Sequence, residues 1–257
     1  MWRHRREGNG RPLILLHGIG MSHAAWNPVI PLLAAERQVI AFDTAGFGDT
    51  PPLPDGVVPT VRNLVATLAD SLGELGITTP VDIAGNSLGG LMALEAAKLG
   101  IARSVVALSP AGLWKESISP HVRHVFQGLR WSAQTFPALA RAALRFSLTR
   151  EAILAIPLSP GSRKMPASDA IRVMEDFSGA RSFDATFANL HRFASGQSIS
   201  VPVTVAFGGR DWILPKSSQR RDELPLQTRW VFPRNWGHVP MWVDPEGVVR
   251  LILEGTQ

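Results

Sequence analysis

One short segment constrains the fold more than any other part of the sequence. The apolar run Val81–Ala84 leads into Gly85–Gly89, which reads Gly-Asn-Ser-Leu-Gly, and then into the helix-length stretch Leu91–Leu99. A Gly-x-Ser-x-Gly pattern between a strand and a helix is typical of a sharp turn that exposes its serine. The two outer glycines leave space beside the turn because they have no side chain. The segment therefore predicts a strand, a tight turn at Ser87 and a helix.

Ser87 is a candidate nucleophile. It would open the following helix, where free backbone N–H groups and the positive end of the helix dipole stabilise negative charge. That position suits acyl transfer, in which negative charge develops on a carbonyl oxygen. The alternative is an ordinary glycine-rich turn in which the serine caps the helix.

Length and composition favour a single globular unit. The chain has 257 residues, enough for one large α/β domain with an insertion. Hydrophobic residues make up 45% of it, and no apolar run approaches the ~18 residues of a membrane span. The absence of cysteine excludes disulfides and thiolate metal sites. No signal peptide is recognised at the basic N-terminus, so we expect a cytoplasmic protein.

The formal net charge of +5 originates in the middle of the chain. Residues 112–196 contain 11 Lys and Arg against 6 Asp and Glu, which leaves 15 of each kind elsewhere. These basic residues are scattered singly among apolar ones and lack the clustering typical of nucleic-acid binding. We therefore expect a solvated cationic face, with neither a nucleic-acid partner nor peripheral membrane contact.

Strand-like and helix-like segments alternate through the first 110 residues. Strands are expected at Leu13–Leu16, Gln38–Phe42, Val81–Ala84 and Arg103–Leu108, and helices near His23–Ala35, Thr60–Leu75 and Ser87–Leu99. This alternation predicts βαβ units and a mostly parallel sheet.

The alternation stops at Ser109–Gly112. The following segment is rich in Ala, Leu, Phe and Arg and is interrupted by prolines, which predicts several short helices. Strand character returns at Val201–Phe207 and Thr228–Phe232, and an amphipathic helix follows Pro245. We therefore predict an α/β core made of residues 1–111 and 197–257, with a helical lid inserted at residues 112–196.

Two further polar residues follow expected strands. Asp211 ends the segment Gly208–Asp211, and His238 lies in Asn235–Pro240. Open α/β sheets build their sites in loops at the carboxyl ends of strands. A nucleophilic serine needs a base and an acid that orients the base. Known enzymes with these three groups can carry them in the order Ser, Asp, His along the chain. We therefore predict Ser87 as nucleophile, His238 as general base and Asp211 as the orienting acid.

An oxyanion hole is expected beside the nucleophile. The first expected strand ends in His17-Gly18-Ile19-Gly20. We assign the hole to the backbone N–H groups of Ile19 and Leu88, because backbone donors are available whatever the side chain. His17 is expected to be structural.

Together these segments resemble the α/β-hydrolase superfamily, in particular its lidded esterase-like branch. The resemblance covers nearly all of the chain outside the lid and rests on Leu16–Gly18, Asp43–Gly48, Gly85–Gly90, Gly208–Asp211 and Gly237–Pro240. It implies a structural role for the Asp43–Gly48 loop at the rim of the site. The short N-terminal region leaves little room for the first strand of the family, so this edge of the sheet is expected to be missing or shortened.

The resemblance implies a serine hydrolase that cleaves small to medium carboxylic esters with an apolar part, without a cofactor or metal. Two alternatives stay open: a carbon–carbon bond hydrolase of the meta-cleavage type, which also has an asparagine before its nucleophile, and a non-catalytic ligand receptor on the same fold. Epoxide hydrolases and haloalkane dehalogenases use an aspartate nucleophile, so Ser87 argues against both. Three tryptophans lie close in sequence to the site loops, Trp26, Trp212 and Trp236. They are candidates to line an apolar substrate pocket, and the alternative is that they pack in the core.

Overall fold

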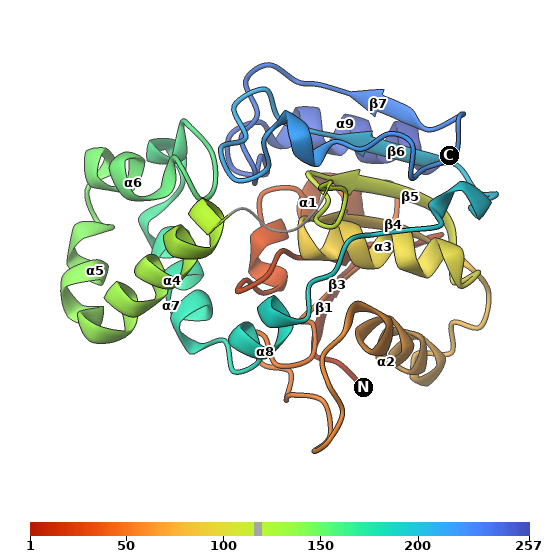
Figure 1. Ribbon diagram of the computed structural model, residues 1–257, viewed down its shortest axis with the longest axis horizontal. Helices are drawn as coiled ribbons and strands as arrows, with labels where there is room; N and C mark the ends of the chain where they lie inside the picture. The colour runs from red at the N-terminus through yellow and green to blue at the C-terminus, as the bar shows by residue number, and fades with distance from the viewer. Residues whose placement is uncertain (116–119) are drawn as a thin grey trace.

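The computed structural model describes residues 1–115 and 120–257. In this part of the chain seven strands form one sheet in the order β1-β3-β2-β4-β5-β6-β7 (Figure 1). The strands are β1 (His4–Glu7), β2 (Pro12–Leu16), β3 (Gln38–Phe42), β4 (Val81–Asn86), β5 (Ala102–Leu108), β6 (Val203–Ala206) and β7 (Arg229–Val231). β1 runs antiparallel to β3, and every other neighbouring pair is parallel. The mostly parallel sheet expected from the sequence is therefore confirmed.

Both faces of the sheet are covered by apolar side chains. On β2, Ile14 and Leu16 belong to one buried cluster, and Leu13 and Leu15 belong to a second. This division follows from strand geometry, because successive side chains point to opposite faces. Helices α2 (Val61–Glu74) and α3 (Leu88–Lys98) cover the first face, and α1 (Ile30–Ala34) and α9 (Pro245–Gly255) cover the second (Figure 1).

The two edges of the sheet differ in detail from the sequence expectation. β1 is present but has only four residues, which pair with β3 from His4 opposite Phe42 to Glu7 opposite Val39. The N-terminal edge is thus shortened, not missing. Near the other edge, β6 begins only at Val203, because Pro202 has no N–H to donate to the sheet.

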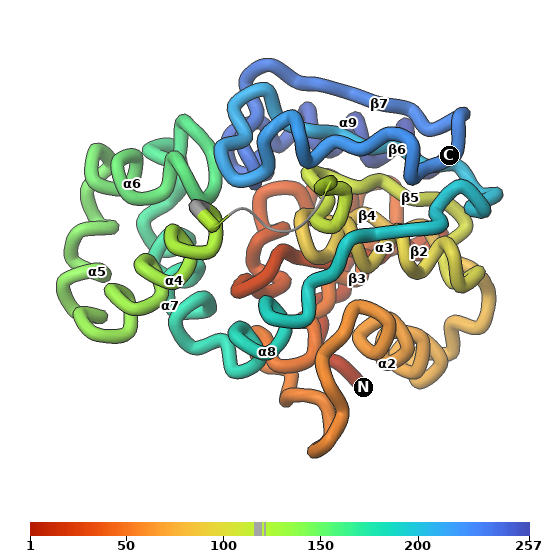
Figure 2. The backbone as a smooth tube through the Cα atoms, viewed as in Figure 1, coloured from red at the N-terminus to blue at the C-terminus, as the bar shows by residue number. Residues whose placement is uncertain are grey.

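Between β5 and β6, the described residues form five α-helices that lie beside the sheet. They are α4 (Pro120–Thr135), α5 (Pro137–Ala143), α6 (Ser147–Leu154), α7 (Ala167–Gly179) and α8 (Phe183–Ala188). Figure 2 shows the chain leaving the sheet after β5 and returning as β6. We call α4–α8 the inserted helices; the predicted lid also includes residues 116–119, which lie outside the described part. Phe183 and Phe187 of α8 belong to the same buried cluster as α3, so this last inserted helix packs onto the core.

Two buried side chains hold the loops that follow β2 and β3. The His17 imidazole accepts the N–H of Thr44 at Nε2 (3.0 Å) and donates from Nδ1 to the carbonyl of Gly18 (2.7 Å). This arrangement requires a neutral ring, and burial lowers the pKa of His17 below its ordinary value. Asp43 accepts the backbone N–H and Nδ1–H of His23 (2.7 and 2.8 Å) and the N–H of Asp49 (3.0 Å). The two groups therefore fix the loops from β2 and β3 relative to each other.

We expect Asp43 to contribute stability that is lost in acid. Burial raises its pKa, but hydrogen bonds from His23 and Asp49 and the neighbouring imidazoles outweigh this effect and lower it from 3.8 to about 2. The contribution is therefore complete above about pH 4 and disappears as the pH falls towards 2. Asp43→Asn should lower the free energy of unfolding by about 2 kcal/mol at pH 7 and by much less near pH 2.

Urea unfolding followed by tryptophan fluorescence at a series of pH values measures this difference. Asp55→Asn, at an exposed loop position, is the matched control and should change stability by less than about 0.5 kcal/mol. A loss for Asp43→Asn that has the same size at pH 7 and pH 2 contradicts the ionised role of Asp43.

Candidate active site

Ser87 lies on a strained turn between β4 and α3. Its backbone angles are φ 53° and ψ −113°, a combination that non-glycine residues rarely adopt. The turn is held by hydrogen bonds from the Ser87 N–H to the carbonyl of Leu108 (2.9 Å) and to the Ser87 carbonyl from the N–H groups of Leu91 and Ala111 (3.0 Å each). The surrounding strand and helix therefore impose the conformation that places the serine at the end of β4.

The glycines of the motif allow this turn to pack closely. A Cβ atom on Gly85 would lie 2.1 Å from the carbonyl oxygen of Gly89, and one on Gly89 would lie 2.1 Å from that of Leu16. Real Cβ atoms do not approach backbone oxygens this closely. The spacing of the two glycines is therefore a steric requirement for bringing β4, α3 and β2 together at Ser87.

His238 and Asp211 are in direct contact. The Nδ1 atom of His238 lies 2.9 Å from Oδ2 of Asp211, and Oδ1 of Asp211 accepts the N–H groups of Ile213 (2.9 Å) and Leu214 (2.8 Å). Burial raises the pKa of Asp211, but His238 and these hydrogen bonds lower it to below its ordinary value. An ionised carboxylate accepts only, so it holds the proton on Nδ1 and leaves Nε2 of His238 as the acceptor.

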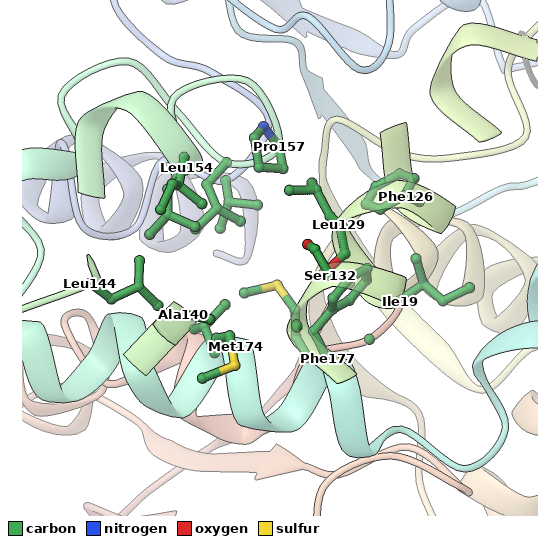
Figure 3. A pocket seen from close by; sticks show the side chains of 18 of the residues that line it. Ile19, Phe126, Leu129, Ser132, Ala140, Leu144, Leu154, Pro157, Met174 and Phe177 are labelled. Carbon is green, nitrogen blue, oxygen red and sulfur yellow. The ribbon is translucent and has the colours of Figure 1, made fainter. Parts of the chain in front are cut away.

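Ser87 and His238 line the same cavity, which has a volume of about 380 Å³. Among the described residues, the wall includes four polar side chains, Asn86, Ser87, Ser132 and His238, and none from Asp, Glu, Lys or Arg. The rest of the wall is glycine or apolar and comes largely from the inserted helices. Figure 3 shows Phe126 and Leu129 of α4 and Met174 and Phe177 of α7 around this space.

The two expected oxyanion donors lie next to Ser87. Leu88 is the first residue of α3 and directly follows Ser87. Ile19 follows Gly18, and a Cβ atom built on Gly18 would lie 3.4 Å from Cβ of Ser87. In the part of the chain that the structure describes, neither the Ile19 nor the Leu88 N–H donates to another protein group. Ile19 also lines the cavity. The first turn of a helix leaves such N–H groups free for a ligand.

The three tryptophans expected in the pocket do not line this cavity. Trp26 is completely buried in the second apolar cluster, on the face of the sheet covered by α1 and α9. Trp236 is buried as well, and its Nε1–H donates to Asp244 (2.7 Å). Trp212, in the loop after β6, is 53% exposed. Proximity in sequence to a site loop did not determine where each indole points, so the sequence expectation for the pocket is corrected.

Two groups of residues at the site were not identified from the sequence. Ser109, directly after β5, has φ 43°, and its side chain helps to lower the pKa of Asp211. A serine before a proline at a strand end is a signal that could have drawn attention to it. In the sequence, the wall residues of α4 and α7 show only the helical spacing of apolar residues. This pattern is the same for a helix that lines a cavity and for one that packs in a core.

Comparisons with known proteins bear on both the fold and the family. A 2-hydroxy-6-oxo-6-(2'-aminophenyl)hexa-2,4-dienoic acid hydrolase of Metapseudomonas resinovorans is 36% identical over 116 residues, 43% of this chain and 39% of that protein. The chain thus spans about two fifths of that relative. A pimeloyl-[acyl-carrier protein] methyl ester esterase of Photobacterium profundum is 28% identical over 96% of this chain and 95% of its own length.

Structural comparison gives the same architecture. The carboxylesterase CesB (YbfK) from Bacillus subtilis superposes with a TM-score of 0.74 at 22% identity, covering 97% of this chain and 85% of that one. At this identity the likeness concerns the fold alone. The family model described as the alpha/beta hydrolase family matches residues 13–251, which include the sheet from Leu13 of β2 to β7, the loops with Ser87, Asp211 and His238, and the inserted helices. The chain therefore belongs to the α/β-hydrolase family.

Proposed function

We propose that this α/β-hydrolase is a serine hydrolase that cleaves small to medium carboxylic esters through an acyl-enzyme. The observation that carries the proposal is one apolar cavity lined by both Ser87 and His238, with His238 held by Asp211 at 2.9 Å. A nucleophile, a base and an orienting acid are the groups that acyl transfer requires. The esterase of Photobacterium profundum, which aligns over nearly the whole chain, adds support.

In this mechanism Nε2 of His238 removes the proton from the Ser87 hydroxyl as the oxygen attacks the ester carbonyl. The N–H groups of Ile19 and Leu88 stabilise the oxyanion, and His238 returns the proton to the departing alcohol. His238 then activates water, which attacks the acyl-enzyme and releases the acid and free Ser87. Asp211 keeps the proton on Nδ1 and stabilises the imidazolium that forms in each step. These steps use only groups of this chain, ester and water.

The cavity wall favours an ester with an apolar, uncharged arm. Its volume of about 380 Å³ is in the lower part of the range for small-molecule sites. Apolar groups that move from water into such a space contribute roughly 0.8 kcal/mol per CH₂. A charged group would lose its hydration without meeting an opposite charge among the described wall residues. The inserted helices act as the lid in this proposal, because they supply most of the wall.

The second candidate function is carbon–carbon bond hydrolysis of a dienoate. Asn86 before the nucleophile and the 36% identity to the dienoic acid hydrolase favour it. That match covers less than half of either protein, however, and the described wall holds no Arg or Lys for a carboxylate of the substrate. Binding a non-reacting carboxylate in an apolar wall is costly without a cation. We therefore prefer ester hydrolysis to carbon–carbon bond hydrolysis. A non-catalytic receptor would differ from both kinds of enzyme by its lack of turnover.

The cytoplasmic location remains a prediction from the sequence.

We predict that Ser87→Ala and Asp211→Asn each lower ester turnover by a factor of order 10⁴. The first change deletes the nucleophilic oxygen, and the second favours the wrong tautomer of His238. Ser87→Ala deletes a single oxygen, so its unfolding midpoint should stay close to that of the native protein. Asp211→Asn should also lower the midpoint, because the folded protein stabilises the ionised carboxylate. The measurement is kcat with p-nitrophenyl butyrate and hexanoate, with Asp55→Asn as the control that retains full activity. Native turnover in Ser87→Ala removes Ser87 from the mechanism.

We also predict that kcat/KM for p-nitrophenyl hexanoate exceeds that for a ring-fission dienol. The reason is that the ester needs only an apolar slot and the oxyanion donors, whereas the dienol must also place a carboxylate. Both substrates should be compared on one preparation of the protein. A preference for the dienol of more than about tenfold, or ~1.4 kcal/mol in transition-state binding, would reverse the assignment.

A further inference from the structure

The loop that carries the expected oxyanion donor Ile19 forms a tight turn. The N–H of Met21 donates to the carbonyl of Gly18 (3.1 Å) and closes the turn, so Ile19 and its neighbour Gly20 are the two central residues. Gly20 has a φ of 75°, which glycine adopts at this position without strain. On the side of the sheet core, His17 donates from Nδ1 to the same carbonyl of Gly18 (2.7 Å). Because peptide units are planar, the direction of the Ile19 N–H depends on how the whole turn is held.

On the other side, two neighbouring residues of α7 hold this turn. A Cβ atom built on Gly20 would lie 2.4 Å from Cδ2 of Phe177, so the turn packs directly against the ring of Phe177. The hydroxyl of Ser22, which follows the turn, donates to Oδ2 of Asp176. Figure 3 shows Phe177 and Ile19 at the border of the same cavity. One of the inserted helices therefore contacts the oxyanion loop at two points.

The hydrogen bond between Ser22 and Asp176 is shielded and has a defined geometry. Ser22 is 1% exposed and the side chain of Asp176 is 8% exposed, so water competes little for either group. Arg172, one helical turn earlier on α7, donates from Nε to Oδ1 of Asp176 (2.8 Å) and limits the rotation of the carboxylate. The Ser22 oxygen also accepts the N–H of Ala24 (3.2 Å). Both partners are thus held in place by further hydrogen bonds.

We propose that Ser22 and Asp176 are positioning residues for the oxyanion donor Ile19. Their hydrogen bond makes α7 a fixed part of the oxyanion hole, although this helix belongs to the inserted segment and not to the sheet core. The inference rests on the proposed ester hydrolysis and adds two residues outside the triad to it. In the described part of the chain, the cavity wall includes neither side chain. Both therefore act through the position of Ile19 and not by contact with the ester.

A displaced Ile19 N–H weakens the stabilisation of the oxyanion. Negative charge on the carbonyl oxygen develops in the transition state, so the loss appears in kcat more than in KM. Complete removal of one oxyanion donor costs a factor of about 10²–10³ in kcat. A donor that is still present but shifted should cost less, and we expect a loss of about tenfold.

The test is a double-mutant cycle with Ser22→Ala, Asp176→Ala and the variant that carries both changes. Hydrolysis of p-nitrophenyl hexanoate is measured at a temperature at which every variant is folded. Each single change should lower kcat by about tenfold and keep KM within about twofold of the native value. The double variant should lose no more than the poorer single variant, because all three lack the same hydrogen bond. Native kcat in either single variant, or losses that multiply in the double variant, overturns the proposal.

Asp169→Ala is the matched control. Asp169 also lies on α7 and also accepts a hydrogen bond from a core residue, the Nε1–H of Trp242 (2.9 Å), but this partner lies outside the oxyanion loop. The change should lower the unfolding midpoint, as Asp176→Ala does, and leave kcat within about twofold of the native value. A loss of kcat as large as that of Asp176→Ala would reflect a general loosening of α7 and overturns the specific role.

A reaction without turnover tests the same hole. When Ser87 attacks a p-nitrophenyl alkylphosphonate, negative charge develops on the phosphonyl oxygen, which uses the same N–H donors. The rate of p-nitrophenol release should fall in Ser22→Ala by about the same factor as kcat, and an unchanged rate overturns the proposal. If the native protein hydrolyses no p-nitrophenyl ester, ester hydrolysis itself fails. Ester hydrolysis that continues at the native kcat in both single variants contradicts only the positioning role.

Discussion

The site depends on the backbone conformation of one residue, Ser87. With φ at 53° and ψ at −113°, the chain turns sharply from β4 into α3 and carries the serine side chain into the cavity. Strain of this kind costs of order 1–3 kcal/mol and persists only where the surroundings enforce it. Here the hydrogen bonds to Leu108, Leu91 and Ala111 enforce it, and Gly85 and Gly89 permit the close packing. The same turn also makes Leu88 the first residue of a helix, with its N–H beside the serine.

The reacting groups and the cavity wall come from different parts of the chain. The sheet core supplies Ser87, Asp211 and His238 from loops at the carboxyl ends of β4, β6 and β7, whereas α4–α7 supply most of the apolar wall. The two parts meet at the His238 loop. Val239 donates its N–H to the carbonyl of Leu158 (2.9 Å) and accepts the hydroxyl of Ser159, while Asn86 holds the carbonyl of His238 from the core side. The loop that carries His238 is therefore held by hydrogen bonds from both sides, from Asn86 at the end of β4 and from Leu158 and Ser159 in the segment between α6 and α7.

The sequence predicted the sheet well because its signals are local. Gln38–Phe42 matches β3 at both ends, and the segments that contain Ser87, Asp211 and His238 each follow a strand of the parallel sheet. Parallel strands bring such loops to one edge, so spacing along the chain was enough to place them together. The wall of the cavity could not be predicted in this way. Trp26 points into the core and Trp212 into solvent because tertiary packing, not nearness in sequence, decides a side chain's surroundings.

Asn86 illustrates the same limit on a smaller scale. Its position before the nucleophile is plain in the sequence, but its two carbonyl partners come from β5 and from the loop after β7, far along the chain. Only the three-dimensional arrangement fixes the orientation of the amide. The apolar composition of the wall likewise emerges only when α4, α5, α6 and α7 are brought together over Ser87.

Covalent trapping of the nucleophile shows whether Ser87 attacks the substrate. Incubation with a p-nitrophenyl alkylphosphonate, followed by mass spectrometry of the intact protein and of its peptides, locates the residue that attacks. We expect stoichiometric release of p-nitrophenol, a single phosphonyl adduct on Ser87, and no adduct in Ser87→Ala. An adduct on another residue, or ester hydrolysis that continues unchanged without any adduct, would exclude Ser87 as the nucleophile.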